Sequence, residues 1–501
     1  MSTLVPLPVV VPLLGAALTL LLAARPRLQR LVSVLCLGGT LTVAVLLLVQ
    51  AYRHGPVVVA VGAWPAPFGI VLVADQLAAL MLVVSSAVTL CVLLYSIGQG
   101  RSETGESSPV VIFHPTYLVL TAGVTNAFLA GDLFNLFVGF EILLAASFVL
   151  ITLGGSEARI RTGSTYVVVS ILSSMIFLTA VGLVYAATGT LNLAQLARRL
   201  DDLPDGVRLA LELMLLLAFA IKAAVFPLSA WLPDSYPTAP APVTAVFAGL
   251  LTKVGVYAII RTETLLFPGG HADVLLMVVA GLTMVIGILG AVAQSDLKRL
   301  FSFTLVSHIG YMIFGVALST AAGLSGAIFY VVHHITIQTT LFLVAGLVEE
   351  RAGSTDLRRI GGLARVAPLL GVLFFVPAMN LAGVPPFSGF LGKLGLLQAG
   401  VAVGGPLPWA LVAAGTLTSL LTLYVASRVW NIAFWRAPRL ATSEPAVRLP
   451  KLMVGATVAL VAFGLALTVL AGPLFDVTAD AAADLRLRTP YVDAVLPNGV
   501  P

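Results

Sequence analysis

Charged residues are scarce in this sequence. They make up 10% of its 501 residues, whereas 59% are hydrophobic and the mean hydropathy is +1.06. Soluble domains carry about 25% charged residues, so this composition excludes a soluble protein and indicates a membrane protein. The net charge of +5 comes from loop Lys and Arg that orient membrane helices, so no nucleic-acid partner is expected.

Cysteines and catalytic motifs are also scarce. The two cysteines, Cys36 and Cys91, lie in apolar stretches and are expected to be small buried side chains. No glycine-rich phosphate loop, nucleophile elbow or cofactor motif is present, and no histidine has further ligands at metal spacing. We therefore expect no cofactor, no metal site and no enzyme activity. In a redox complex the chain would be the non-redox pumping arm.

Long apolar runs, by contrast, occur throughout the chain. A helix needs about 20 mostly apolar residues to span a membrane, and about fourteen such segments are predicted. They lie near residues 3–24, 30–50, 74–97, 112–131, 133–154, 164–188, 207–232, 241–261, 273–294, 300–320, 324–348, 366–402, 407–435 and 451–473. The expected fold class is an all-α polytopic membrane protein with two inverted five-helix repeats, each containing a broken helix.

The spans predict a domain organisation and an orientation. Residues 1–110 hold three N-terminal helices, 111–262 and 263–435 hold the two repeats, and 436–501 hold the last span and an external tail. From residue 474 the tail is expected to be loosely ordered. Basic residues concentrate in the loops that follow odd-numbered spans, so these loops should be cytoplasmic and both termini outside.

Four ionisable side chains fall inside predicted spans: Glu141, Lys222, Lys253 and Lys393. The chain has 22 Arg but five Lys, yet three of those lysines are intramembrane. A desolvated lysine can lose its proton, whereas a guanidinium stays charged, so these groups are suited to changing charge. Each costs roughly 2.5–3.5 kcal/mol to insert, which favours a functional role. Ion pairs that join helices are the alternative, although three cations and one anion cannot all pair.

Prolines interrupt the spans that carry two of these lysines. Pro227 follows Lys222 by five residues, and Pro385 and Pro386 precede Lys393. Proline frees carbonyls in mid-membrane, which is tolerated only where protein or water satisfies them. Two such spans, five spans apart, indicate an inverted-repeat transporter, with ordinary proline kinks as the alternative.

Three histidines are candidates to bridge the lysines. His308, His333 and His334 lie between Lys253 and Lys393 along the chain, and imidazole titrates near neutrality. Because adjacent residues point about 100° apart on a helix, at most one of His333 and His334 should face the path, and His334 is favoured. Each histidine could equally be a satisfied core residue.

The stretches that contain these residues resemble a known family. They are "GDLFNLFVGFEILLAASFVL", "IKAAVFPLSAWLPDSYPTAPAPVTAVFAGLLTKVGVYAIIR", "QSDLKRLFSFTLVSHIGYM" and "GVPPFSGFLGKLGLLQAG". Over residues 70–435 the chain resembles the antiporter-like family. This family comprises the proton-translocating membrane subunits of respiratory complex I and the homologous subunits of Mrp-type cation/proton antiporters. The length and two of the motifs are most similar to the D-type Mrp subunits.

The resemblance implies roles for individual residues. Glu141, Lys222, Lys253 and Lys393 match a relay of ionisable groups at the bilayer midplane, in which Glu141 and Lys222 are partners. Gln338 stands where many relatives have a lysine. Glutamine cannot titrate, so a relay through this point must use a histidine, hydroxyl groups or water.

The function implied by this resemblance is proton translocation within a multi-subunit Mrp-type antiporter of the plasma membrane. External protons would be exchanged for cytoplasmic Na⁺ or a similar cation, with other membrane subunits and the lipid bilayer as partners. A pumping arm of complex I or of a membrane-bound hydrogenase is the alternative, followed by a non-transporting scaffold.

Three further positions have simpler interpretations. Asp234 could gate proton uptake, although a surface turn residue is favoured. Ser295 or Asp296 is expected to cap the helix that follows. Glu212 is expected to snorkel to the surface or to cap its helix.

Overall fold

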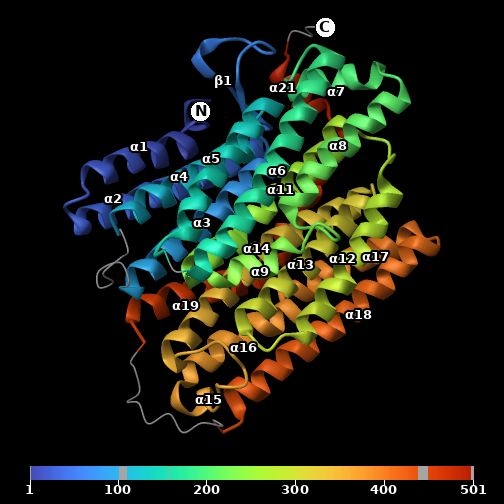
Figure 1. Ribbon diagram of the computed structural model, residues 1–501. Coiled ribbons are helices and arrows are strands. Elements are labelled where there is room, and N and C mark those ends of the chain that lie inside the picture. The colour runs from blue at the N-terminus through green and yellow to red at the C-terminus, as the bar shows by residue number, and fades with distance from the viewer. Residues whose placement is uncertain (1, 101–109, 156, 438–448, 498–501) are drawn as a thin grey trace.

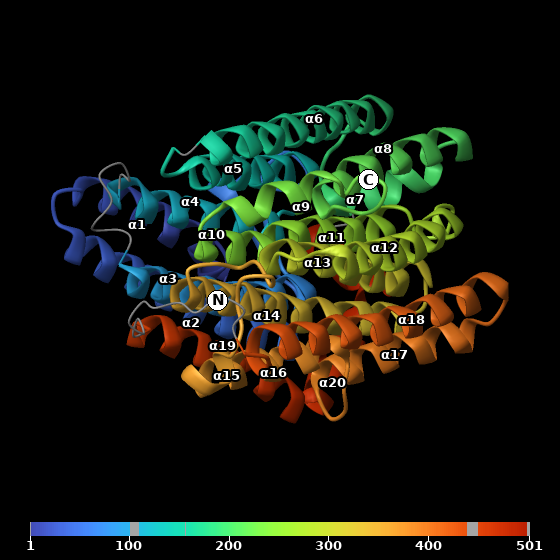
Figure 2. The same cartoon turned by 60° about the horizontal axis from the view of Figure 1, so that its bottom comes forward.

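The computed structural model describes residues 2–100, 110–155, 157–437 and 449–497. Helices dominate it, and they run side by side as a bundle (Figure 1). In Figure 2, α6 lies on one side of this bundle and α20 on the other. The α-helices are α1 (Leu7–Leu21), α2 (Pro26–His54), α3 (Gln76–Gln99), α4 (Val110–Leu129), α5 (Leu133–Thr152), α6 (Glu157–Thr188), α7 (Leu193–Arg199), α8 (Asp205–Ala223), α9 (Trp231–Ser235), α10 (Ala241–Val246), α11 (Thr252–Arg261), α12 (Asp273–Ala293), α13 (Leu297–Ala317), α14 (Ala321–Ala352), α15 (Leu363–Val366), α16 (Pro368–Ala382), α17 (Ser388–Val403), α18 (Pro406–Val429), α19 (Lys451–Val469), α20 (Ala471–Leu487) and α21 (Thr489–Val495).

Short elements complete the architecture. They are the 3₁₀ turns η1 (Ser2–Leu4), η2 (Val61–Ala63), η3 (Leu200–Asp202) and η4 (Tyr236–Thr238), the π-helical turns η5 (Phe247–Leu251), η6 (Thr262–Leu266) and η7 (Trp430–Trp435), and the strands β1 (Val57–Ala60) and β2 (Val71–Ala74). The strands pair antiparallel, with Val57 opposite Ala74. The all-α prediction missed this hairpin, which lies at the end of the bundle where η1 and α21 both contact β1 (Figure 1).

The expected multi-span helical membrane protein is confirmed. Within the described residues, 11 helices are long and apolar enough to cross a membrane, and α16 and α17 are shorter apolar helices. The count of fourteen spans and the two inverted repeats stay predictions.

The prediction of a loosely ordered tail was wrong. Residues 471–487 form α20 and residues 489–495 form α21. Both helices pack on the bundle, and their apolar side chains Leu485, Tyr491 and Val495 are buried there. These apolar residues are interspersed with Asp and Arg, so the segment has no long apolar run that sequence reasoning would single out.

The most deeply buried helices lie in the middle of the bundle. α14 and the continuous stretch from α10 to η6 are buried over their whole apolar windows. Glycine allows close helix contacts around them: a Cβ on Gly255 of α11 would lie 2.7 Å from the backbone nitrogen of Ala223 in α8. Small residues at such contacts let membrane helices approach closely.

Two helices are interrupted inside the bundle. α8 ends at Ala223, the next residue Ala224 is left-handed with φ 57°, and helix resumes only at Trp231, beyond Pro227. α16 ends before Gly383, with φ 84°, and α17 begins at Ser388 after the two prolines. Each interruption leaves the last carbonyls of a helix without intrahelical donors.

Candidate functional site

The first interruption brings Lys222 close to Glu141. The Ser174 hydroxyl of α6 donates a hydrogen bond to Oε1 of Glu141 on α5, and Nζ of Lys222 on α8 donates to the same hydroxyl at 3.1 Å. Nζ also lies 5.1 Å from the ring centroid of Phe140. A serine hydroxyl that accepts from an ammonium and donates to a carboxylate joins the two charges in one hydrogen-bonded chain.

The position of Lys222 on its helix favours a cation. It occupies the last turn of α8, where the helix dipole and free carbonyls present negative partial charge. Its exposed fraction is 8%. Lys222 lines a cavity of about 20 Å³ together with Ser170, Ser173 and Tyr166. This volume can hold about one water. Lys222 is thus shielded from bulk solvent but borders a cavity of about the size of one water.

Lys253 lies on α11, beyond α9, η4, α10 and η5 along the chain. It is completely buried in the first turn of α11, directly after the π-helical turn η5. Its Nζ donates to the Ala248 carbonyl at 2.6 Å. A π-turn displaces one carbonyl from the regular helical ladder, and such turns are frequent at functional sites.

His308 and His334 stack on one another between α13 and α14, with ring centroids 5.4 Å apart. Nδ1 of His308 lies 2.6 Å from the Tyr330 hydroxyl, and Nε2 lies 3.3 Å from Oγ1 of Thr422. Neither ring nitrogen of His334 has a hydrogen-bond partner among the described residues. His308 is therefore the satisfied member of the pair.

His333 and Gln338 contact other elements. Nδ1 of His333 lies 3.0 Å from Oγ of Ser388, the first residue of α17, so the ring points to the second interruption. Gln338 donates from Nε2 to the Phe301 carbonyl at 2.7 Å, and its Oε1 has no partner among the described residues. The adjacent histidines diverge as expected from helical geometry, with His334 toward α13.

Lys393 lies at the second interruption. Its Nζ donates to the carbonyls of Leu381 and Ala382, at 2.9 and 3.1 Å, which are the last two residues of α16. The ammonium also lies 5.1 Å from the ring centroid of Tyr311. Lys393 on α17 thus supplies the donors that the broken helix lacks.

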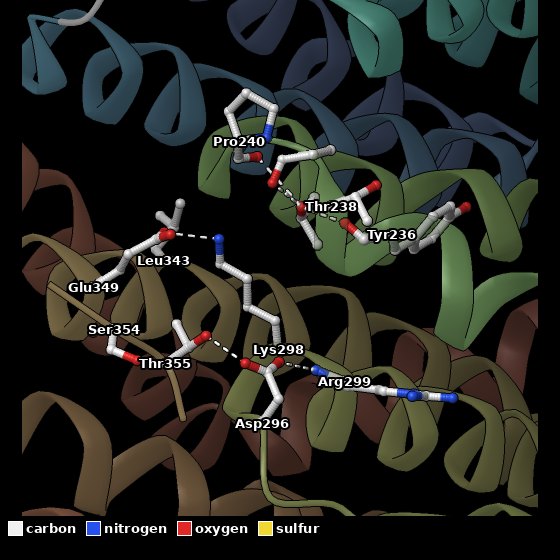
Figure 3. A network of polar contacts seen from close by, with 12 residues as sticks. Tyr236, Thr238, Pro240, Asp296, Lys298, Arg299, Leu343, Glu349, Ser354 and Thr355 are labelled. Carbon is white, nitrogen blue, oxygen red and sulfur yellow. Dashed lines mark hydrogen bonds and ion pairs between the residues drawn. The ribbon is translucent and has the colours of Figure 1, made fainter. Parts of the chain in front are cut away.

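A second polar network lies near the start of α13 (Figure 3). Asp296 caps this helix by accepting from the Arg299 backbone N–H at 2.9 Å, which confirms the predicted cap, and it also accepts from the Thr355 hydroxyl. Lys298 is 6% exposed and pairs with Glu349 at the end of α14, at 2.7 Å. Sequence analysis did not anticipate that ion pair.

Asp234 lies at the exposed rim of this network. Its Oδ1 accepts from the Arg299 guanidinium at 2.8 Å, and both side chains are roughly half exposed. The contact links α9, after the first interruption, to α13. In the nearby loop, hydrogen bonds from Arg358 hold the pKa of Asp356 below its usual value.

Sequence reasoning missed the hydroxyl groups that connect these residues. Ser174, Tyr330, Thr422 and Ser388 each contact a predicted site residue. Hydroxyls in apolar helices usually bond to their own backbone, so a single one carries little signal. The Ser173–Ser174 pair in a long apolar run was the clearest hint.

The fold and the site define a multi-span helical membrane protein with lysines buried beside interrupted helices. Residues 130–422 match the family model described as "NADH:quinone oxidoreductase/Mrp antiporter, TM". The chain is 40% identical over 499 residues to the D-type subunit of the Na(+)/H(+) antiporter of Alkalihalophilus pseudofirmus, covering 99% of this chain and 100% of that protein.

Solved structures agree with this match. A chain of the Mrp complex from Dietzia sp. DQ12-45-1b is similar at a TM-score of 0.93 and 34% identity, covering 99% of this chain and 100% of that one. A chain of respiratory complex I from Thermus thermophilus is similar at a TM-score of 0.80 and 27% identity, over 95% and 99%. The chain belongs to the NADH:quinone oxidoreductase/Mrp antiporter family, and the resemblance read from its motifs is confirmed.

Proposed function

We propose that this chain is the proton-translocating subunit of a multi-subunit Mrp-type antiporter that exchanges protons for Na⁺ or a similar monovalent cation across the plasma membrane. Relatives named as D-type subunits of Na(+)/H(+) antiporters support this proposal, as does the similarity to a chain of an Mrp complex. Its partners are then the other membrane subunits of such a complex.

The observation that carries the proposal is the chain of contacts from Lys222 through Ser174 to Glu141. An ionised Glu141 stabilises the ammonium form of Lys222 against the cost of burial. When Glu141 takes up a proton, that stabilisation is lost and the ammonium is left in a dry site. Lys222 then releases its proton, so the two groups exchange protons in a coupled way.

The proposed path continues from Lys222 to Lys253, through His334, and on to Lys393. Two features support it. Each lysine lies at a helix irregularity: Lys222 precedes the break after α8, Lys253 follows the π-helical turn η5, and Lys393 donates to the last carbonyls of α16. Among the described residues, the ring nitrogens of His334 have no hydrogen-bond partner. Gln338 donates to a backbone carbonyl and cannot carry a proton itself. His334 and water are the proposed carriers at this point.

The test replaces Glu141 or Lys222 with Ala in the complete reconstituted complex. We expect sodium-linked proton exchange to fall to background with all subunits still assembled. Lys451→Ala is the matched control, because Lys451 is exposed at the start of α19. Unchanged exchange in an assembled Glu141→Ala or Lys222→Ala complex would refute the proposal.

A second candidate function is the pumping arm of a redox complex, which the similarity to a chain of complex I supports. Its relay chemistry would be the same. Purification with native partners distinguishes the two, because quinone-reductase or hydrogenase subunits would favour the redox arm. A non-transporting scaffold would be indicated if a variant that lacks Glu141, Lys222 and Lys253 kept full activity.

A further inference from the structure

A pair of carboxyl groups lies outside the proposed relay, on α8 and on η6. Glu212 is completely buried, and neither of its carboxyl oxygens has a hydrogen-bond partner among the described residues. The expectation that it snorkels to solvent or caps α8 was therefore wrong. Glu212 is the eighth residue of α8, beyond the turn where a cap acts.

The partner of Glu212 is another acid. The Glu263 carboxyl on η6 lies beside the Glu212 carboxyl, close enough to share a hydrogen bond once one of the two carries a proton, and its Oε1 is also buried without a donor among the described residues. Two ionised carboxylates in such contact repel one another, and neither satisfies the other. A single proton placed between them removes both costs, because the protonated acid donates to the ionised one.

The surrounding charges do not neutralise the pair. On α8, Arg208 donates to the Pro268 carbonyl at 2.8 Å and approaches Asp201 at 3.4 Å. His271 lies just before α12 and Asp273 is its first residue, and both charges lie near Glu212. The Ala272 backbone amide also lies near the Glu212 carboxyl. None of these neighbouring bases donates a hydrogen bond to a Glu212 oxygen or to Oε1 of Glu263 among the described residues.

Asp273 is the third acid, and it has its own donor. It accepts from the Ser319 hydroxyl at 2.7 Å. The described residues contain no group of three acids, histidines or cysteines placed to hold a metal ion. The pair is therefore assigned to a proton, and the Na⁺ dependence measured below distinguishes it from a site for a metal cation.

A cavity gives Glu263, and through it the pair, access to water. It has a volume of about 340 Å³, and Glu263, Asp273 and Arg486 line it together with Ser319 and Thr320. That is room for several waters, at about 30 Å³ each. The exposed Gly269 lies in its wall. By the predicted topology, the loop that contains Gly269 is external.

The pair also has a structural connection to the relay. Glu263 follows Lys253 by ten residues on the continuous rod of α11 and η6, about 15 Å along its axis. Glu212 lies on α8, the helix that carries Lys222. Both helices of the pair thus run inward to relay lysines.

We propose that Glu212 and Glu263 form a proton-binding site that opens through Glu263 to the cavity beside the loop between η6 and α12. The site takes one proton from the cavity, so the pair changes from two negative charges to one, and returns it there in the reverse step. This inference rests on the proposed proton translocation and locates its exchange with the external water.

The first test uses the complete complex in vesicles with Glu212→Gln or Glu263→Gln. Glutamine is close in shape to a protonated glutamate, so assembly should be preserved. We expect the external proton concentration for half-maximal exchange to shift at least threefold, with the Na⁺ dependence at fixed pH unchanged. Asp202→Asn, at an exposed acid on η3 near the same end, is the control and should show no shift.

The second test does not require transport. Infrared difference spectroscopy across a pH titration should show a protonated-carboxyl band that disappears in Glu212→Gln and in Glu263→Gln. The same band should persist in a transport-inactive Lys222→Ala complex, which separates a failure of this site from a failure of the proposed function. If a glutamine variant does not assemble, Glu212→Asp should keep a band at a shifted frequency.

Two results would overturn the inference. One is an unchanged band and an unchanged external proton dependence in both glutamine variants. The other is a change in Na⁺ dependence without a change in proton dependence, which would mean that the pair binds the metal cation.

Discussion

The two interrupted helices hold their lysines in different ways. Lys222, at the end of α8, donates to the Ser174 hydroxyl, which in turn donates to the Glu141 carboxylate. Lys393, after the break between α16 and α17, donates to the carbonyls of Leu381 and Ala382. Within the described residues, Lys222 is linked to a carboxylate whose charge can change, whereas Lys393 is linked to backbone carbonyls whose dipoles are fixed.

This difference separates two kinds of proton site. Carbonyl dipoles stabilise an ammonium by a fixed amount, so the protonation of Lys393 follows its own surroundings. The stabilisation of Lys222 depends on whether Glu141 is ionised, so its protonation follows that of another group. We infer that the protonation of Lys222 is coupled to that of Glu141, and that Lys393 has no such carboxylate partner among the described residues.

The largest expected effect concerns coupling. In a double-mutant cycle on the assembled complex, Glu141→Gln and Lys222→Met should show an interaction energy of about 1–3 kcal/mol in thermal unfolding, because they share one hydrogen-bonded chain. Glu141→Gln and Lys393→Met should be additive within about 0.5 kcal/mol. Equal coupling in the two cycles would remove the distinction between the sites.

The next effect concerns Lys393 alone. Lys393→Met leaves two buried carbonyls without their donor, which should lower the free energy of unfolding by about 1–3 kcal/mol. Lys393→Arg keeps donors and should be less destabilising, yet exchange should stop because a guanidinium does not release its proton. Thermal unfolding and vesicle exchange assays check both results, and an active Lys393→Arg complex would contradict the assigned role.

A smaller effect is expected at the bridging hydroxyl. Ser174→Ala removes the link between Lys222 and Glu141, so exchange should slow about three- to tenfold, the equivalent of one hydrogen bond. Ser173→Ala is the matched control, because the Ser173 hydroxyl donates to the Ala218 carbonyl instead. Equal initial rates in the two variants would show that the hydroxyl has no special role.

The smallest effect is expected at the rim. Asp234→Asn breaks the exposed contact with Arg299 between the first interruption and α13. Exposed ion pairs contribute about 0–1 kcal/mol and are screened by salt. Exchange should be nearly unchanged, and a loss of more than tenfold would instead assign Asp234 to proton uptake.

Much of the fold followed from local properties of the chain. Apolar runs predicted the long helices, and the prolines after Lys222 and before Lys393 lie where α8 ends and where α16 gives way to α17. The packed α20 and the β-hairpin were missed because their signals are short. α20 has only a few apolar residues on one face, and each strand has four residues.

The sequence by itself determined that the chain is a membrane protein and that Lys222, Lys253 and Lys393 are buried, because hydropathy and the cost of burying charge are properties of individual segments. Only the tertiary structure decided which partner each buried group has. Ser174 is 33 residues from Glu141 and 48 from Lys222, and Glu212 meets Glu263 across two helices. Such contacts depend on how helices pack, and the proton chemistry of each group depends on those contacts.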